Sequence, residues 1–163
     1  MAAVVLAAGA SSRYGGVKQR ELLPAVLDSL SRAPVDEVVV VEGAHRLDDR
    51  AEATRARLVH CDDWDTGPGA SLRCGLAALG PGVARAVVVL ADGPDLDPRS
   101  IERVLERDEP VLAATYDGRT RSHPVVLARA AWSRVPDAGG RGLDPVLVDC
   151  SDLTPPGDVD YRS

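Results

Sequence analysis

The stretch LAAGASSRYGGVK, residues 6–18, follows an apolar start and contains the only lysine of the chain, Lys18. Its glycines can adopt positive φ angles and let the backbone approach a ligand closely. Successive backbone N–H groups in such a loop form a nest that binds anions, and Arg13 and Lys18 add positive charge. The loop therefore predicts phosphate binding, although glycine-rich loops between a strand and a helix also serve only to turn the chain.

The spacing in this loop excludes two well-known phosphate-binding motifs. A P-loop has four residues between its glycines and then Gly-Lys-Ser/Thr, whereas five residues separate Gly9 from Gly15 and a glutamine follows Lys18. The dinucleotide fingerprint G-x-G-x-x-G is absent as well. A nicotinamide-dependent oxidoreductase is therefore disfavoured.

Valine-rich apolar runs recur along the chain, with segments of helical periodicity between them. Continuous apolarity indicates strands buried on both faces, as in a parallel sheet covered by helices. We expect strands at 3–8, 37–42, 57–61, 86–91, 111–116, 124–127 and 146–150, and helices at 21–31, 70–79 and 97–107. This alternation predicts a doubly wound α/β fold, a three-layer α/β/α sandwich with a mostly parallel, Rossmann-like sheet. The length of 163 residues fits one domain, residues 1–163.

Composition and charge disfavour some classes of binding partner. A net charge of −6 disfavours nucleic acid, and no apolar run approaches the roughly 20 residues that cross a bilayer. The start lacks the basic segment of a signal peptide, so we expect a cytoplasmic protein. Cys61, Cys74 and Cys150 are odd in number and lack metal-site spacing, so we expect reduced thiols that mostly pack in the interior.

Residues 6–18 closely resemble the LAAG-x-S-x-R-M-G-x-x-K signature of the MobA-like nucleotidyltransferases, which act on the molybdenum cofactor; Tyr14 replaces the usual Met. Leu-Ala-Ala-Gly looks more like the cytidylyltransferase branch than the guanylyltransferase branch. The resemblance implies a sheet of the nucleotide-diphospho-sugar transferase type. It also implies that Arg13 and Lys18 hold a triphosphate. The residues that it assigns to the nucleotide in this loop are Leu6, Ala7, Ala8, Gly9 and Gly15.

The segment DDWDTGPGASLRCGLAAL, residues 62–79, is similar to the family's N-P-x-W-x-x-G-M-x-x-S-L-x-x-G-L stretch. There a loop closes over the nucleotide and then starts a helix. Ser71 falls in the first turn, where a hydroxyl and free backbone amides can contact an anion or a base edge. Alternatively, Ser71 only caps the helix and Trp64 covers the core.

The segment VVVLADGPDLDP, residues 87–98, resembles the family's strand that ends in D-Q-P. Asp92 is then expected at the same sheet edge as the glycine loop, as a ligand of Mg²⁺, which prefers one or two carboxylates together with phosphate oxygens and water. A turn-capping role is the alternative for Asp92. Asp95 and Asp97 are expected to serve as turn and N-cap residues of the following helix.

The end of the chain, PGDVDYRS, residues 156–163, resembles the family's D-I-D-T-P-E-D ending, where an aspartate completes the metal site. Asp158 and Asp160 are two residues apart in an extended segment and so point to the same side. Either could reach the metal, although solvated acids are equally common in such a tail.

The acceptor half of the chain matches the family less closely. YDGRTRSHPVVLARAAW, residues 116–132, looks like Y-x-G-x-x-G-H-P-V-L-x-x-x-x-W, and we expect His123 to shape the acceptor pocket rather than to act as an acid or base. Gly93 replaces the glutamine of D-Q-P, and GGRGLD at 139–144 replaces G-D-x-G-A-R. The segment after Lys18 is shorter than usual, and the chain stops at DYRS.

The leading hypothesis is a Mg²⁺-dependent nucleotidyltransferase that moves an NMP group, CTP being the favoured donor, onto a phosphorylated small-molecule acceptor such as molybdopterin. Pyrophosphate is released. Catalysis would rest on positioning and charge neutralisation by Lys18, Arg13 and Asp92. A molybdoenzyme partner is left open. The altered acceptor region motivates the alternative, a nucleotide-binding or regulatory protein of the same fold without turnover.

Overall fold

The fold is built around a seven-stranded sheet, seen in a computed structural model that describes residues 1–8, 18–44 and 56–157, without the side chains of 18–20. The strand order is β3-β2-β1-β4-β6-β5-β7. β6 runs antiparallel to its neighbours β4 and β5, and the other pairings are parallel. The strands are β1 (Ala2–Ala7), β2 (Glu37–Glu42), β3 (Arg57–His60), β4 (Arg85–Leu90), β5 (Val111–Thr115), β6 (Arg121–Ala128) and β7 (Val146–Asp149).

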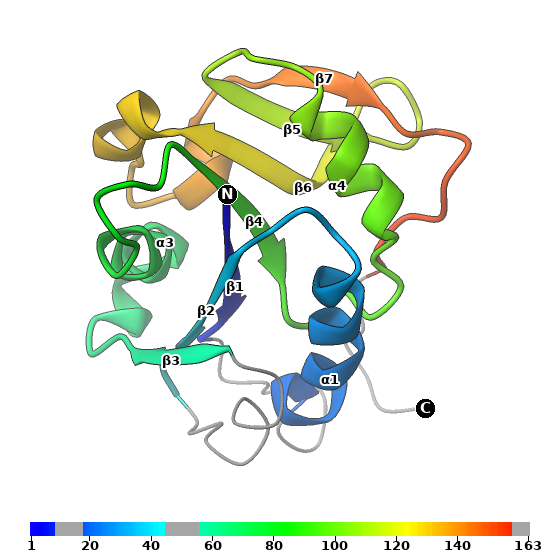
Figure 1. The fold of residues 1–163 in the computed structure, drawn as a ribbon. Helices are drawn as coiled ribbons and strands as arrows, with labels where there is room; N and C mark the ends of the chain where they lie inside the picture. Colours follow the sequence, from blue (N-terminus) through cyan, green and yellow to red (C-terminus); the bar gives the residue numbers. More distant parts are fainter. Residues whose placement is uncertain (9–17, 45–55, 158–163) are drawn as a thin grey trace.

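Helices cover both faces of this sheet and give the expected three layers (Figure 1). The helices are α1 (Lys18–Ser31), α3 (Pro68–Ala77) and α4 (Pro98–Leu105), and the short 3-10 turns are η2 (Trp64–Thr66), η3 (Arg129–Arg134) and η4 (Gly139–Gly142). α1 and α4 bury apolar side chains in one core cluster, and α3 packs in the other, on the opposite face. The predicted α/β/α sandwich is confirmed. Within the described ranges no helix has both the length and the apolar character needed to cross a bilayer.

The order of the central strands creates a crevice at one edge of the sheet. From β1 the chain passes through α1 to β2 on one side, whereas β3 leads through α3 to β4 on the other side of β1. Leu6 pairs with Leu90 at the carboxyl ends of β1 and β4. In doubly wound sheets, ligands bind beyond strand ends at such a switch point.

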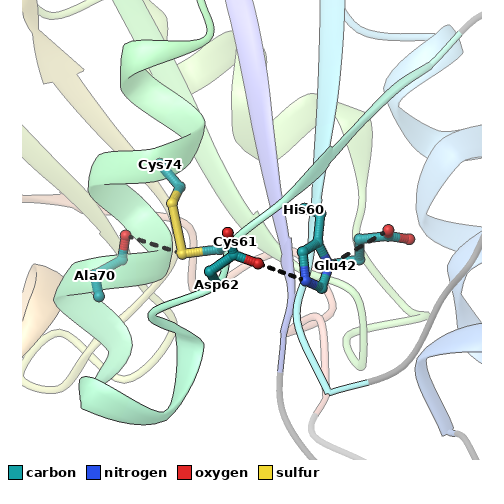
Figure 2. The surroundings of a disulfide bond; sticks show 6 residues. All are labelled: Glu42, His60, Cys61, Asp62, Ala70 and Cys74. Carbon is teal, nitrogen blue, oxygen red and sulfur yellow. Dashed lines mark hydrogen bonds and ion pairs between the residues drawn. A yellow bond between two sulfur atoms is a disulfide. The ribbon is translucent and has the colours of Figure 1, made fainter.

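A disulfide bond joins β3 to α3 and corrects the expectation of three reduced thiols (Figure 2). Cys61, the residue after β3, is bonded to Cys74 of α3, with 6.0 Å between their Cα atoms. The two cysteines meet because α3 packs against β3, a tertiary contact that their spacing in the sequence does not reveal. Cys150 is free and buried, as expected of a packing thiol.

Candidate functional site

The crevice beyond β1 and β4 brings Asp92 beside the start of the glycine-rich loop. The backbone N–H of Ala91 donates a 3.1 Å hydrogen bond to the carbonyl oxygen of Leu6, so the strand pairing continues up to Asp92. Ala7 and Ala8 have buried side chains, which leaves their backbone groups as the atoms that could meet a ligand. The expected ligand residues Gly9, Arg13 and Gly15 lie outside the described residues. Lys18 begins α1, and its side chain is likewise not described.

The turn after Asp92 is in contact with the last described residues of the chain. The N–H of Asp95 donates to the carbonyl oxygen of Pro156 at 3.0 Å. A Cβ added to Gly93 would lie 3.1 Å from the Cβ of Pro156 and 3.3 Å from the carbonyl oxygen of Gly157, so the absence of a side chain there lets the tail approach. Asp158 and Asp160 lie outside the described residues, and Asp158 directly follows this contact.

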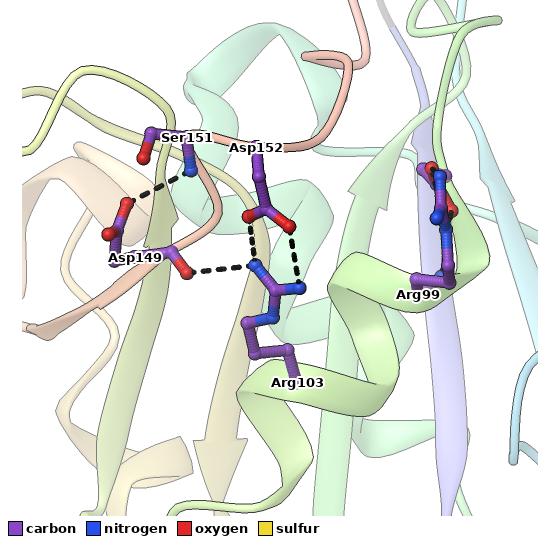
Figure 3. Close-up of polar contacts among 6 residues, drawn as sticks. Arg99, Arg103, Asp149, Ser151 and Asp152 are labelled. Carbon is purple, nitrogen blue, oxygen red and sulfur yellow. Dashed lines mark hydrogen bonds and ion pairs between the residues drawn. The ribbon is translucent and has the colours of Figure 1, made fainter.

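An ion pair holds the segment that leads to the tail (Figure 3). Arg103 of α4 donates to both carboxylate oxygens of Asp152, at 2.5 and 3.1 Å, and to the carbonyl oxygen of Asp149. The guanidinium holds the pKa of the Asp152 carboxyl below its usual range. At the other end of α4, Asp97 accepts a 2.9 Å hydrogen bond from the N–H of Arg99, which confirms its expected role as the N-cap.

The start of α3 is occupied by protein rather than open to a ligand. The N–H of Gly69 donates a 2.9 Å hydrogen bond to the carbonyl oxygen of Asp137, and that of Ala70 donates to Gly67. The expectation of free amides in this turn is therefore wrong for both: the segment before η4 packs on the N–H of Gly69, and the N–H of Ala70 is bonded within the turn itself. Ser71 is buried and does not line the cavity that lies over β5 and β6. The preceding Gly67 has φ of 149°, a conformation that favours glycine.

A cavity of about 860 Å³ opens from the crevice across the sheet face that α3 covers. Pro68 of α3 and Ala138 and Gly140 near η4 form one wall, and Pro155–Gly157 contribute part of the rim. The cavity thus joins the strand ends beside Asp92 to the region expected to bind the acceptor. The strand side chains that form its floor are Leu6, Leu90, Val111, Ala113, His123 and Val125.

His123 lies in this cavity between opposite charges. Burial lowers the pKa of its imidazole to about 4; the negative charge of Asp92 opposes the shift, and the positive charge of Arg141 adds to it. The side chain is therefore neutral at pH 7. The hydroxyl of Tyr116 donates a 2.8 Å hydrogen bond to the carbonyl oxygen of His123 and fixes the backbone there. His123 thus lines a cavity, and its expected role in shaping an acceptor pocket stays a prediction.

Arg121 is a structural residue that the sequence did not single out. Its guanidinium donates to the carbonyl oxygens of Gly140 at 3.0 Å and Leu143 at 2.5 Å, and also to that of Arg141. It thereby fixes the loop around η4 over the cavity. The sequence around Arg121 gives no sign of this role, because the carbonyl groups that it binds are 19 to 22 residues further along the chain.

A second polar group lies where β2 and β3 end. His60 places Nδ1 3.6 Å from Oε1 of the buried Glu42 and Nε2 3.1 Å from Oδ1 of Asp62 (Figure 2). Its Nδ1 is buried without a hydrogen-bond partner. In the described part of the chain, no three His, Cys, Asp or Glu side chains form a group that could hold a metal ion.

Comparison with known proteins gives matches over nearly the whole chain. The sequence profile of the MobA-like NTP transferase domain matches residues 3–152. The structure is similar to that of the Rv0371c protein from Mycobacterium tuberculosis H37Rv, with 26% identity, a TM-score of 0.78, and 99% of this chain and 93% of that chain covered. A complex of Rv0371c with manganese also matches, with 24% identity, a TM-score of 0.68, and coverage of 91% and 88%.

Two further solved structures share the fold. A nucleotidyl transferase from Methanothermobacter has 22% identity and a TM-score of 0.78, covering 98% of this chain and 91% of that chain. A CMP:2-keto-3-deoxy-manno-octonic acid synthetase complexed with CTP has 15% identity and a TM-score of 0.75, with coverage of 98% and 93%. No curated protein sequence matches this chain.

Proposed function

Because this chain belongs to the MobA-like NTP transferase family, we propose that it transfers a nucleotidyl group from CTP onto a phosphorylated small-molecule acceptor and releases pyrophosphate. The observation that carries this proposal is the position of Asp92. It follows β4 at the crevice, beside Leu6 at the end of β1, where the large cavity begins. Donor and acceptor could thus meet at one point.

The triphosphate would lie on the loop that follows Leu6, with Lys18 and Arg13 as its cationic partners. Both charges persist at physiological pH, and backbone amides of the loop add fixed dipoles. An oxygen of the acceptor phosphate would attack the α-phosphorus in line, and the bond from that phosphorus to the leaving pyrophosphate would break. Positioning and charge neutralisation suffice for this displacement, so no nucleophilic side chain is needed.

Asp92, together with Asp158 or Asp160, would hold Mg²⁺. The residues fit this ion: Mg²⁺ is a hard cation that takes carboxylate oxygens, and Gly157, which precedes Asp158, lies against the turn that follows Asp92. When bound, the ion would neutralise charge on the phosphates during the displacement. The manganese complex of the Rv0371c protein supports a divalent metal in this family.

The choice of CTP rests on two observations. The loop reads Leu-Ala-Ala-Gly, as in the cytidylyltransferase branch, and the synthetase that shares this fold was solved with CTP. The acceptor, such as molybdopterin, would lie in the cavity over β5 and β6, where His123 and Val125 form part of the floor. A phosphate on the acceptor would then point toward the strand ends beside Asp92.

Pyrophosphate release tests the proposal. The full chain would be incubated with CTP, GTP or ATP, with and without Mg²⁺, and with molybdopterin or other phosphorylated acceptors. We expect acceptor-dependent release that requires the metal and is fastest with CTP. Binding of CTP and Mg²⁺ without release from any acceptor would instead support the alternative, a nucleotide-binding protein without turnover.

A further inference from the structure

The large cavity continues into a second pocket of about 460 Å³. The two pockets are adjacent, because Arg121, Arg141 and Pro145 line both, and together they are called the trough. On β6, Arg121, His123 and Val125 all line the large cavity. The second pocket adds Arg119, from the turn between β5 and β6, and Leu147 of β7.

The trough runs across the strands. From Leu6 on β1 it reaches Leu147 on β7, which is four strand positions away in the order β1-β4-β6-β5-β7. Neighbouring strands are ~4.8 Å apart, so the two ends of the trough are separated by roughly 15–20 Å. A ligand that fills the trough is longer than its reacting phosphate group alone.

The far end of the trough is positively charged. Arg119, Arg121 and Arg141 line it together with one carboxylate, that of Asp144. The guanidinium of Arg121 already donates hydrogen bonds to three backbone carbonyl oxygens and is therefore not available to a ligand. Arg119 and Arg141 are exposed, and their guanidinium groups make no hydrogen bond or ion pair with any described residue.

The backbone around both arginines is nevertheless fixed. The carboxylate of Asp117 accepts hydrogen bonds from the N–H groups of Arg119, at 2.8 Å, and Thr120, at 2.7 Å, which orders the turn that carries Arg119. The guanidinium of Arg121 donates a hydrogen bond to the carbonyl oxygen of Arg141 and so fixes the backbone there. Two guanidinium groups that have no partner among the described residues, on ordered backbone, are suited to an oxyanion, which arginine binds through its planar fork of donors.

We propose that the acceptor carries a second anionic group, a phosphate or a carboxylate, at the end opposite its reacting phosphate, and that Arg119 and Arg141 bind this group. The inference rests on the proposed function for the identity of the ligand as the acceptor. The anion site itself rests only on the trough and the two arginines. The acceptor is thus an elongated molecule, anionic at both ends, whose less polar middle lies over Ala113 and Val125. This favours an acceptor other than molybdopterin, whose single phosphate would be the reacting group.

Titration with inorganic phosphate and with acetate tests the anion site. NMR of the Nε–Hε groups of arginine in the full chain would report each site separately. We expect saturable shifts of the Arg119 and Arg141 signals. The anion that binds more tightly, phosphate or acetate, indicates whether the acceptor carries a phosphate or a carboxylate. The single variants Arg119→Ala and Arg141→Ala assign the two signals, and the double variant, titrated by calorimetry beside the parent, should bind the anion at least tenfold more weakly. Arg134→Ala is the matched control, since Arg134 is exposed at the end of η3 and away from the trough.

Signals of Arg119 and Arg141 that respond to neither anion, or a double variant that binds as tightly as the parent, would overturn the inference. A parallel titration of the parent protein with CTP and Mg²⁺ separates the two claims. Nucleotide binding without anion binding would refute the second anionic group alone. Anion binding without nucleotide binding would leave the arginine site standing and refute the proposed transfer reaction.

Discussion

The backbone N–H of Asp95 donates a 3.0 Å hydrogen bond to the carbonyl oxygen of Pro156. This bond ties the end of the chain to the turn that follows Asp92, across more than 60 residues of sequence. The ion pair between Arg103 and Asp152 holds the preceding segment in place. Gly157, the last described residue, therefore lies beside the turn that follows Asp92, which supports the proposal that Asp158 or Asp160 holds the metal.

Removal of these acids should weaken metal-dependent nucleotide binding. A chain that ends after Gly157 lacks Asp158 and Asp160, whereas a chain that ends after Asp160 keeps both. We expect the shorter chain to lose at least ~10-fold in affinity for CTP in the presence of Mg²⁺, the size of loss typical when a metal site is perturbed. Calorimetric titration of both chains measures this. Equal affinities would exclude the tail from the metal site.

Gly69→Ala should destabilise the fold, because a Cβ there would lie 1.9 Å from the carbonyl oxygen of Pro136. Backbone atoms would have to move, at a cost of about 2 kcal/mol or more in the free energy of unfolding. Gly82→Ala is the matched control, since nothing lies within 4 Å of a Cβ at that position, and its effect should stay within ~0.5 kcal/mol. Urea unfolding compares the two. Equal stability of both variants would contradict the close contact between α3 and the segment before η4.

Continuous apolar runs made much of this fold predictable. β1, β2 and β4 lie within one residue of their expected bounds because they are buried on both faces and consist mostly of valine and alanine. The sequence does not reveal that β6 runs antiparallel to β4, because the strand direction depends on pairs such as Ala128 with Arg85, which are far apart in the sequence. β6 also starts at Arg121 rather than at 124, because Arg121 and Ser122 pair with β5 despite their polarity.

The candidate site was predictable in part. The placement of Asp92 at the carboxyl edge of the sheet follows from the end of an apolar run, and the Asp97 cap follows from Asp-Pro before a helix. The roles of Lys18, Arg13 and Asp92 stay predictions. Contacts between distant segments, such as Cys61 with Cys74 or Gly69 with Asp137, leave no local pattern in the sequence.

The stability of the protein should depend on pH through His123. Its pKa is about 4 in the folded chain and about 6.5 when exposed, so the unfolded state binds more protons between these values. Stability should therefore rise from pH 4 to pH 6.5, by at most about 3 kcal/mol from this group. Urea unfolding of the parent and of His123→Gln, across this range, isolates the contribution. A difference between them that does not change with pH would refute the buried, neutral imidazole.

Reduction of the disulfide should lower stability. The bond joins residues 13 apart in the sequence, and closing a loop of this size stabilises a folded chain by about 3 kcal/mol in the chain-entropy description. Thermal unfolding with and without a thiol reductant should show a lower midpoint under reducing conditions. The variant Cys61→Ser/Cys74→Ser should not respond to reductant. A parent protein that is equally insensitive would show that the bond does not form.

The most direct test of the central claim is a calorimetric titration with CTP, with and without Mg²⁺, of the parent, Asp92→Asn and Asp108→Asn. Asp108 is an exposed aspartate after α4, at the opposite edge of the sheet, and serves as the control. We predict that Mg²⁺ strengthens CTP binding to the parent and to Asp108→Asn, and that Asp92→Asn loses this gain while remaining folded. Metal-dependent binding that survives in Asp92→Asn, or its absence from the parent, would contradict a nucleotidyl-transfer site at this crevice.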